Sequence, residues 1–179
     1  MEENRKKQIS KGLSYWLRHR PEKIGITLDK EGWTDVVELL EKAKIEIEFT
    51  LEELKEVVET NDKKRFVFSE DLSKIRASQG HSVEVEIKFK EINPPPVLFH
   101  GTVSKHMDSI NKKGLIPGNR HHVHLSKDKE TAEKVGGRKG VPIILKINAY
   151  KMKDDGYTFY ISENGVYLID HVPSKYFLK

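Results

Sequence analysis

The sequence predicts an α+β protein of two lobes, and three observations predict it. Up to Glu59, apolar side chains recur at the spacing of amphipathic helices. From residue 97 onward, short apolar and β-branched runs alternate with turn residues, as in a strand-rich domain. Between them lies Asn93-Pro94-Pro95-Pro96, and such a stiff extended stretch is typical of a linker. We therefore expect a lobe at 1–92, a linker at 93–96 and a second lobe at 97–179.

The first lobe begins with three predicted helices. Apolar residues at helical spacing indicate a helix over 4–17, which must end before Pro21. A second helix is expected after Gly32-Trp33-Thr34-Asp35, and Thr50 with Glu53 forms the capping-box pattern that opens a third. The apolar residues that carry the first two helices are Ile9, Leu13, Trp16, Leu17, Val36, Val37, Leu39 and Leu40.

Two short strands, at 65–68 and 74–77, are predicted next, around a turn at 69–73. Three helices followed by a hairpin is the order of a winged helix, a common scaffold for nucleic-acid binding, although fold alone does not establish function. After the polar turn Gln79-Gly80-His81-Ser82, alternating residues over 83–89 predict a strand with one solvated face.

The second lobe is predicted to be rich in strands. A buried strand over 97–99 leads to His100-Gly101-Thr102, and a helix over 103–112 is closed by Gly114. A strand over 120–126 precedes a helix that Ser126 could cap, and the run 141–147 is a central strand. Strands at 157–161 and 165–169 are joined through Asn164-Gly165, a strong hairpin signal.

Composition excludes several classes of protein. The 32 basic and 28 acidic residues give a net charge of +4, which is too mild to indicate nucleic acid by itself. The absence of cysteine excludes disulfides and thiol catalysis and fits a reducing compartment. No run approaches the roughly 20 apolar residues that span a membrane, and no apolar signal segment follows the charged N-terminus. We expect a soluble cytoplasmic protein, a monomer, with no membrane partner.

The stretch at 120–126 carries the densest chemistry. If it is a strand, Arg120, His122, His124 and Ser126 share one face, and the opposite face is mostly apolar. Such a face suits a binding site, although histidines on a half-exposed strand are often merely solvated. A His-x-His pair can also bind a metal ion, but there is no cysteine and the nearest acid, Asp128, lies beyond the strand. A functional site without metal is the favoured interpretation.

Three arginines are candidates for phosphate binding. Arg18, Arg65 and Arg120 each stand at the edge of an element, beside an aromatic or histidine residue. A guanidinium binds a phosphate through two donors at once, which a lysine does not match. Each is equally compatible with a surface ion pair, and Arg18 and His19 also suit the C-terminal end of a helix dipole. Spacing alone does not show that they converge.

Two glycine-containing segments are weaker candidates. Gly101 lacks a Cβ, so His100-Gly101-Thr102 could let a ligand approach the backbone, although these three residues alone favour a simple strand-to-helix turn with Thr102 as a cap. The segment 136–140 is glycine-rich and basic, and we interpret it mainly as a flexible loop with some chance of phosphate contact. No G-x-G-x-x-G or P-loop pattern is present.

The chain resembles the tRNA 2'-phosphotransferase family, enzymes that use NAD to remove an internal 2'-phosphate from RNA. Seven segments in one order carry the resemblance, which runs from about residue 8 to 178. They are Ser10-Lys11-Gly12-Leu13-Ser14-Tyr15-Trp16-Leu17-Arg18-His19, Gly32-Trp33, Lys64-Arg65-Phe66, Ile75-Arg76-Ala77-Ser78-Gln79-Gly80-His81-Ser82, Phe99-His100-Gly101-Thr102, Arg120-His121-His122-Val123-His124-Leu125-Ser126 and Asn164-Gly165-Val166-Tyr167-Leu168.

The resemblance implies a winged-helix lobe, an ADP-ribosyltransferase-like lobe and an active site in the cleft between them. The family's catalytic set falls on Arg18, His19, Arg65 and Arg120. Where many ADP-ribosyltransferases carry a catalytic Glu, Val166 or a neighbour stands here, with Glu163 close by. NAD, as co-substrate, is expected to contact the residues His100, Gly101, Thr102, His124, Leu125 and Ser126.

The implied reaction has two steps. The RNA 2'-phosphate attacks the nicotinamide ribose of NAD and gives an RNA-2'-phospho-ADP-ribose intermediate. The ribose 2''-hydroxyl then attacks the phosphorus and releases 2'-hydroxyl RNA and ADP-ribose 1'',2''-cyclic phosphate. Two alternatives remain open: an ADP-ribosyltransferase acting on terminal phosphates of nucleic acids, and a winged-helix protein that binds nucleic acid without catalysis.

Overall fold

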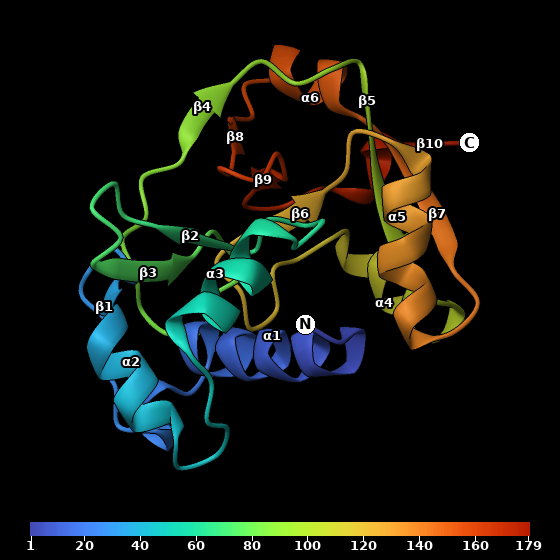
Figure 1. The fold of residues 1–179 in the computed structure, drawn as a ribbon. Coiled ribbons are helices and arrows are strands. Elements are labelled where there is room, and N and C mark those ends of the chain that lie inside the picture. The colour runs from blue at the N-terminus through green and yellow to red at the C-terminus, as the bar shows by residue number, and fades with distance from the viewer. The chain divides into compact units, whose positions relative to one another are not determined.

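A computed structural model describes all residues, 1–179, and they form two compact units, Met1–Lys88 and Phe89–Lys179. Figure 1 shows the elements of each unit, and each is described by itself. None of the helices combines the length and the apolar character that crossing a membrane requires.

The first unit is built on helix α1, Glu3–Arg18. The helix buries one stripe formed by Ile9, Leu13, Trp16 and Leu17, each 0% exposed, which confirms the predicted apolar face. It ends with His19 as its C-cap, and the short 3-10 helix η1, Pro21–Lys23, follows. Because proline disfavours helix at the residue before it, the chain turns at this point.

Two further helices complete the helical part of the unit. Helix α2, Val36–Ala43, is capped by Asp35, whose carboxylate accepts from the Glu38 backbone N–H. Helix α3, Leu51–Glu59, begins with both bonds of the predicted capping box. The Glu53 backbone donates to the Thr50 hydroxyl over 3.2 Å, and the Thr50 backbone donates to the Glu53 carboxylate over 3.0 Å. Two backbone donors at the start of the helix are thereby satisfied.

A small antiparallel sheet, in the order β1-β3-β2, closes the first unit. Strand β2, Phe66–Phe68, pairs with β3, Lys74–Ala77, as predicted, and β1, Thr34–Asp35, pairs with the other edge of β3. Its Phe66, Ile75 and Ala77 join the buried residues of the helices in one apolar core. This arrangement is compatible with a winged helix, which stays a prediction.

The expected strand over 83–89 is wrong. These residues belong to no strand, and the strand β4, Lys90–Ile92, comes after them. The segment is held by single backbone bonds from Val83 to Arg18 and from Glu86 to Lys30. Because β4 pairs with β8, the second unit begins at Phe89, ahead of the expected linker at 93–96.

The second unit contains two antiparallel sheets. One has the order β10-β7-β5, with β5 at Val97–Thr102, β7 at Ile143–Asn148 and β10 at Phe177–Leu178. The other has the order β4-β8-β9-β6, with β8 at Phe159–Ile161, β9 at Tyr167–Ile169 and β6 at Val123–Leu125. A bridge between Phe99 and Ser126 joins the two sheets.

The helices of this unit are α4, Ser104–Lys113, α5, Lys129–Gly136, and α6, Ala149–Asp154, with the 3-10 helices η2, Gly137–Lys139, and η3, Ser174–Tyr176. Helix α5 lies along the β5–β7 pair, as Figure 1 shows. The core between the elements includes Leu98, Ile147, Met152 and Phe159, each 0% exposed.

Local signals were correct for the hairpin and only partly correct for the strand at 120–126. Asn164-Gly165 does form the β8–β9 turn, with Gly165 at φ +79°. Strand β6 covers only Val123–Leu125, whereas Arg120 belongs to a turn in which its N–H donates to the Pro117 carbonyl. Helix α5 is capped by Asp128 rather than by Ser126, since Ser126 pairs with Phe99 through backbone bonds.

Candidate active site

In the first unit, Arg18 and His19 stand at the C-terminal end of α1. The Arg18 side chain is only 8% exposed, and its backbone carbonyl accepts from Ser82 N–H over 2.8 Å and from Val83 N–H over 3.3 Å. The His19 ring is hydrogen-bonded through Nδ1 to the Ser82 hydroxyl over 2.9 Å. The loop after β3 therefore holds the end of the helix on which both predicted residues lie.

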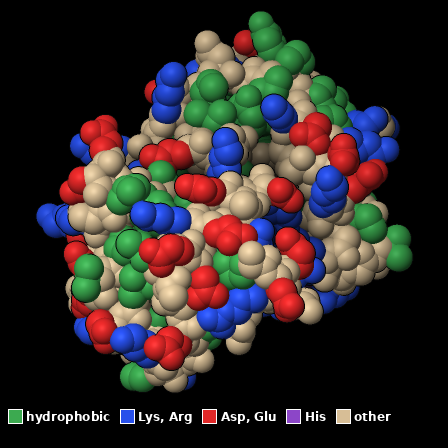
Figure 2. Space-filling view, viewed as in Figure 1, with side chains coloured by type: hydrophobic (Ala, Val, Ile, Leu, Met, Phe, Trp, Pro, Cys, Tyr) green, Lys and Arg blue, Asp and Glu red, His purple; other side chains and the backbone are tan.

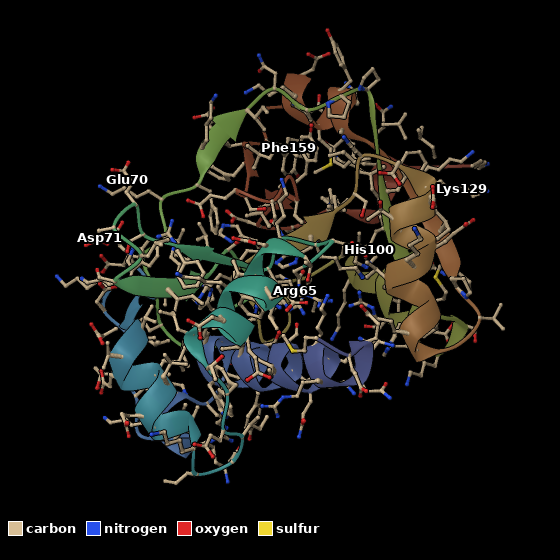
Figure 3. The ribbon with its side chains drawn as sticks, in the orientation of Figure 1. Arg65, Glu70, Asp71, His100, Lys129 and Phe159 are labelled. Atoms are coloured by element: carbon tan, nitrogen blue, oxygen red, sulfur yellow. The ribbon has the colours of Figure 1, made fainter.

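Arg65 directly precedes β2 and is labelled in Figure 3. It is half-buried, and burial lowers the pKa of its guanidinium from the ordinary value because removal of water disfavours the charge. An arginine nevertheless remains protonated at neutral pH. The electrostatic attraction between a partly desolvated cation and a phosphate is stronger than that between a fully hydrated cation and a phosphate.

The backbone around Arg65 is tied to the same loop. Ser78 N–H donates to the Arg65 carbonyl over 2.8 Å, and the Ser78 hydroxyl donates to the Lys64 carbonyl over 3.0 Å. Lys64 has φ +40°, a strained value for a residue with a side chain. Sequence reasoning treated 79–82 only as a polar turn. The structure shows that the loop from Ser78 to Ser82 is bonded to segments carrying His19 and Arg65.

In the second unit, the strands β5 and β6 bring two predicted NAD-contacting segments together. His100 donates from Nδ1 to the His124 backbone carbonyl over 3.0 Å. Burial lowers the pKa of His100 from its ordinary value and outweighs the bond to His124, which raises it, while the positive charge of Lys139 makes the smallest contribution and also lowers it. His100 is thus kept neutral, with its proton on Nδ1 and Nε2 left as an acceptor.

Arg120 and His124 form a side-chain pair. Nη1 of Arg120 lies 3.2 Å from Nδ1 of His124. Since a guanidinium can only donate, His124 accepts at Nδ1 and carries its proton on Nε2 when neutral. The neighbouring Leu125 is 1% exposed, within the core. Of the three residues predicted at this strand end, His124 therefore offers a ring, and Leu125 and Ser126 lie in paired backbone.

Packing requires a glycine at position 101, and the predicted contact with NAD stays a prediction. A Cβ built there would lie 1.8 Å from the Ala132 carbonyl oxygen and 2.9 Å from the Gly136 nitrogen, both backbone atoms of α5. Gly136 is equally constrained, because its Cβ would lie 3.1 Å from backbone atoms of Gly101 and Thr102. The pair lets α5 pack directly on β5. The segment 136–140, interpreted as a flexible loop, instead ends α5 and forms η2.

His122 has surroundings different from those of His124. It lies 3.6 Å from the Asp170 carboxylate, and edge-to-face contacts place it beside the rings of Phe89 and Tyr160. Among the described residues, 1–179, no three His, Asp or Glu side chains are grouped as metal ligands. The shared face expected for His122 and His124 therefore divides into two separate clusters.

Glu163 and Val166, near the position at which many ADP-ribosyltransferases carry a catalytic glutamate, lie in the β8–β9 turn. Glu163 is exposed, and Val166 is half-buried, with its N–H and carbonyl both bonded to Ser162. Charge is also mixed over the surface: acidic and basic side chains alternate on the face seen in Figure 2. On that face there is no broad basic patch.

The pattern that describes the RNA 2'-phosphotransferase, Tpt1/KptA family matches residues 4–171. The chain belongs to this family. The match covers most of both units and includes Arg18, His19, Arg65, His100, Arg120 and His124.

Relatives of the chain are similar over almost their whole length. A protein of Flavobacterium johnsoniae described as a "Probable RNA 2'-phosphotransferase" is 58% identical over 177 residues, which cover 98% of this chain and 97% of the relative. A protein of Burkholderia pseudomallei with the same description is 57% identical, covering 94% and 92%. Another, from Streptomyces coelicolor, is 48% identical, covering 98% and 96%. The similarity therefore runs through both units of the chain.

Proposed function

We propose that the protein removes an internal 2'-phosphate from RNA, with NAD as co-substrate, in two steps. The observation that carries the proposal is a family match that runs through both units and includes the four predicted catalytic residues, Arg18, His19, Arg65 and Arg120. The match to proteins described as RNA 2'-phosphotransferases favours an enzyme over a nucleic-acid-binding module without catalysis.

The arginines are assigned to the phosphate. A guanidinium presents parallel donors to two phosphoryl oxygens, and a partly buried one such as Arg65 does so at low water competition. Charge on the phosphoryl oxygens rises in the second step, when the ribose hydroxyl attacks phosphorus. Preorganised cations stabilise that transition state more than the ground state.

The second unit is assigned to NAD. The properties of its residues fit such a ligand: neutral His100 offers an acceptor at Nε2, and the nearby charge of Lys139 suits a pyrophosphate. His124 is oriented through Arg120. Thr102, only 7% exposed, contributes to the end of β5. NAD supplies the electrophilic ribose carbon, and the roles of these side chains are to bind and orient it.

The two steps require limited proton transfer. In the first, a phosphate oxygen forms a bond to the ribose carbon and nicotinamide leaves, so no base is needed to activate an already ionised nucleophile. In the second, the ribose 2''-hydroxyl attacks phosphorus, loses its proton, and the RNA 2'-oxygen leaves and gains one. We assign His19 to this proton transfer, because an imidazole both accepts and donates near neutral pH.

The test uses a short RNA that carries one internal 2'-phosphate, incubated with the protein with and without NAD. The expected products are 2'-hydroxyl RNA, nicotinamide and ADP-ribose 1'',2''-cyclic phosphate, formed only when NAD is present. A parallel reaction contains an RNA with a terminal phosphate in place of the internal one.

Two results would contradict the proposal. Consumption of NAD with transfer of ADP-ribose to the terminal phosphate, and no loss of the internal phosphate, would show the alternative ADP-ribosyltransferase. If NAD is not consumed with either RNA, while RNA is retained by the protein, the chain acts by binding alone.

A further inference from the structure

The Ser82 hydroxyl contacts His19, a predicted catalytic residue, and has no role in the proposed reaction so far. It stands 2.9 Å from Nδ1 of His19 and 3.4 Å from the backbone carbonyl of Arg18. Both partners belong to the segment at the end of α1, and Ser82 comes from the loop after β3. The hydroxyl thus links the imidazole to the helix end from a separate element.

The hydrogen-bonding capacity of a hydroxyl bears on where the protons lie between the Arg18 carbonyl, Ser82 and His19. A serine has one proton to donate and two lone pairs that accept. The carbonyl of Arg18, 3.4 Å from the Ser82 hydroxyl, can only accept, and a Ser82 proton turned toward it leaves the hydroxyl lone pairs for His19. In that arrangement Ser82 accepts from His19, and the proton of the neutral imidazole is on Nδ1. The nitrogen that takes up and returns a proton is then Nε2.

We propose that Ser82 is a positioning residue that fixes the tautomer and ring orientation of His19, so that Nε2 faces the reaction. The expected effect of Ser82 on the reaction rate rests on the proposed function. Its expected effect on the tautomer of His19 does not. A histidine that transfers protons commonly has its other ring nitrogen oriented by a hydrogen-bond partner, and here that partner is a hydroxyl.

The loop that carries Ser82 is fixed without its hydroxyl. The Ser82 backbone N–H donates to the Arg18 carbonyl over 2.8 Å, and at the other end of the loop Ser78 is 2% exposed and bonded to Lys64 and Arg65. Ser82 itself is exposed and fills no space in the core. Removal of its hydroxyl should therefore alter His19 without unfolding the loop.

The structural test is a nitrogen NMR experiment on protein labelled with ¹⁵N-histidine, in the absence of any substrate. At a pH where the ring is neutral, the spectrum distinguishes the protonated nitrogen from the bare one. The chain has 8 histidines, so the His19 signals are identified by their loss in His19→Gln. We expect a proton on Nδ1 in the parent and in Ser82→Thr, and a mixture of tautomers in Ser82→Ala.

The kinetic test follows nicotinamide release and loss of the RNA phosphate separately. We expect Ser82→Ala to lower kcat about 10-fold with a smaller change in KM, as loss of one hydrogen bond allows. Ser82→Thr, which keeps the hydroxyl, should restore most of the rate. In a His19→Ala background, Ser82→Ala should have no further effect, since the two residues act as a unit.

A matched control is Ser73→Ala in the same unit. The Ser73 hydroxyl also bonds to a side chain, Asp71, over 2.8 Å, but it lies in the β2–β3 turn. This variant should change neither the His19 spectrum nor kcat. An unchanged His19 spectrum in Ser82→Ala would overturn the inference, as would kinetic effects of Ser82→Ala and His19→Ala that simply multiply. If the parent has no NAD-dependent activity, the proposed function fails, and the spectra still test the inference.

Discussion

The two units build their site residues in different ways. In the first unit, Arg18, His19 and Arg65 stand at the ends of elements and are held by a loop that crosses to them. In the second, His100 and His124 lie on strands, and backbone pairing between Phe99 and Ser126 fixes their separation. Strand pairing gives rigid spacing, whereas a loop allows side chains from distant segments to be oriented individually.

The two histidines show what this difference provides. His100 donates to a backbone carbonyl and burial lowers its pKa, so it is held neutral. His19 is bonded at Nδ1 to a serine hydroxyl, which can accept from that nitrogen whether or not Nε2 carries a proton. The first environment suits a fixed binding contact, and the second suits a group that exchanges protons. Five predictions test this division, from the largest expected effect to the smallest.

Arg65→Ala should lower the rate of the second step about 10³-fold, because it removes a preorganised cation from a developing phosphoryl charge. The RNA-2'-phospho-ADP-ribose intermediate should accumulate, which single-turnover assays will show. Arg65→Lys should recover only part of the rate, since lysine lacks the planar fork. Arg20→Ala is the control: Arg20 is exposed and pairs only with Glu22, over 3.2 Å. Equal losses in the two alanine variants would contradict the assignment.

Gly101→Ala should destabilise the second unit by about 3 kcal/mol, as overpacking against backbone does. The added Cβ would lie 1.8 Å from the Ala132 carbonyl oxygen. Gly137→Ala is the control, because a Cβ there meets nothing within 4 Å. Urea denaturation of both variants measures the difference. A stable Gly101→Ala protein that has lost only NAD binding would contradict the packing requirement and support a ligand contact at Gly101.

His124→Ala should lower activity about 10-fold by removing the hydrogen-bond partner of Arg120. The loss should appear with little change in thermal stability, since His124 is only half-buried. His106→Ala, an exposed histidine on α4, is the matched control and should behave as the parent does. The rates of the two variants are compared at saturating NAD. If His124→Ala loses no activity, orienting Arg120 is not one of the roles of His124.

Thr50→Ala should cost about 1 kcal/mol by removing half of the capping box at α3. Hydrogen exchange should accelerate in the first unit and much less in the second. Thr50→Ser retains the hydroxyl and should be close to the parent. Uniform acceleration across both units would show that the two unfold as one cooperative structure.

Acid should destabilise the second unit through His100. Burial lowers the folded pKa of His100 below its ordinary value of 6.5, so the unfolded chain binds the proton more readily. Stability is therefore present above that ordinary value and falls as pH drops below it. His122, whose pKa burial also lowers, adds in the same direction. Urea midpoints at about pH 7.5 and pH 5.5 should differ less in His100→Gln than in the parent, and an equal difference would contradict the buried neutral state.

The signals that predicted correctly act over a few residues. The capping box at Thr50, the apolar stripe of α1 and the hairpin at Asn164-Gly165 each depend on neighbours in the sequence. The incorrect predictions concern pairing with distant segments. The alternation over 83–89 has no strand partner, and Ser126 caps no helix because its backbone is paired with Phe99.

The sequence by itself determined the helices other than α6, the hairpin, the division into two parts and the residue types that suit a phosphate and NAD. Local propensity and side-chain chemistry are carried in short stretches. Only the tertiary structure decided why Gly101 must be glycine, which nitrogen of His100 carries the proton and that Ser82 meets His19. Each of these depends on atoms more than twenty residues apart in the sequence, which only folding brings within bonding distance.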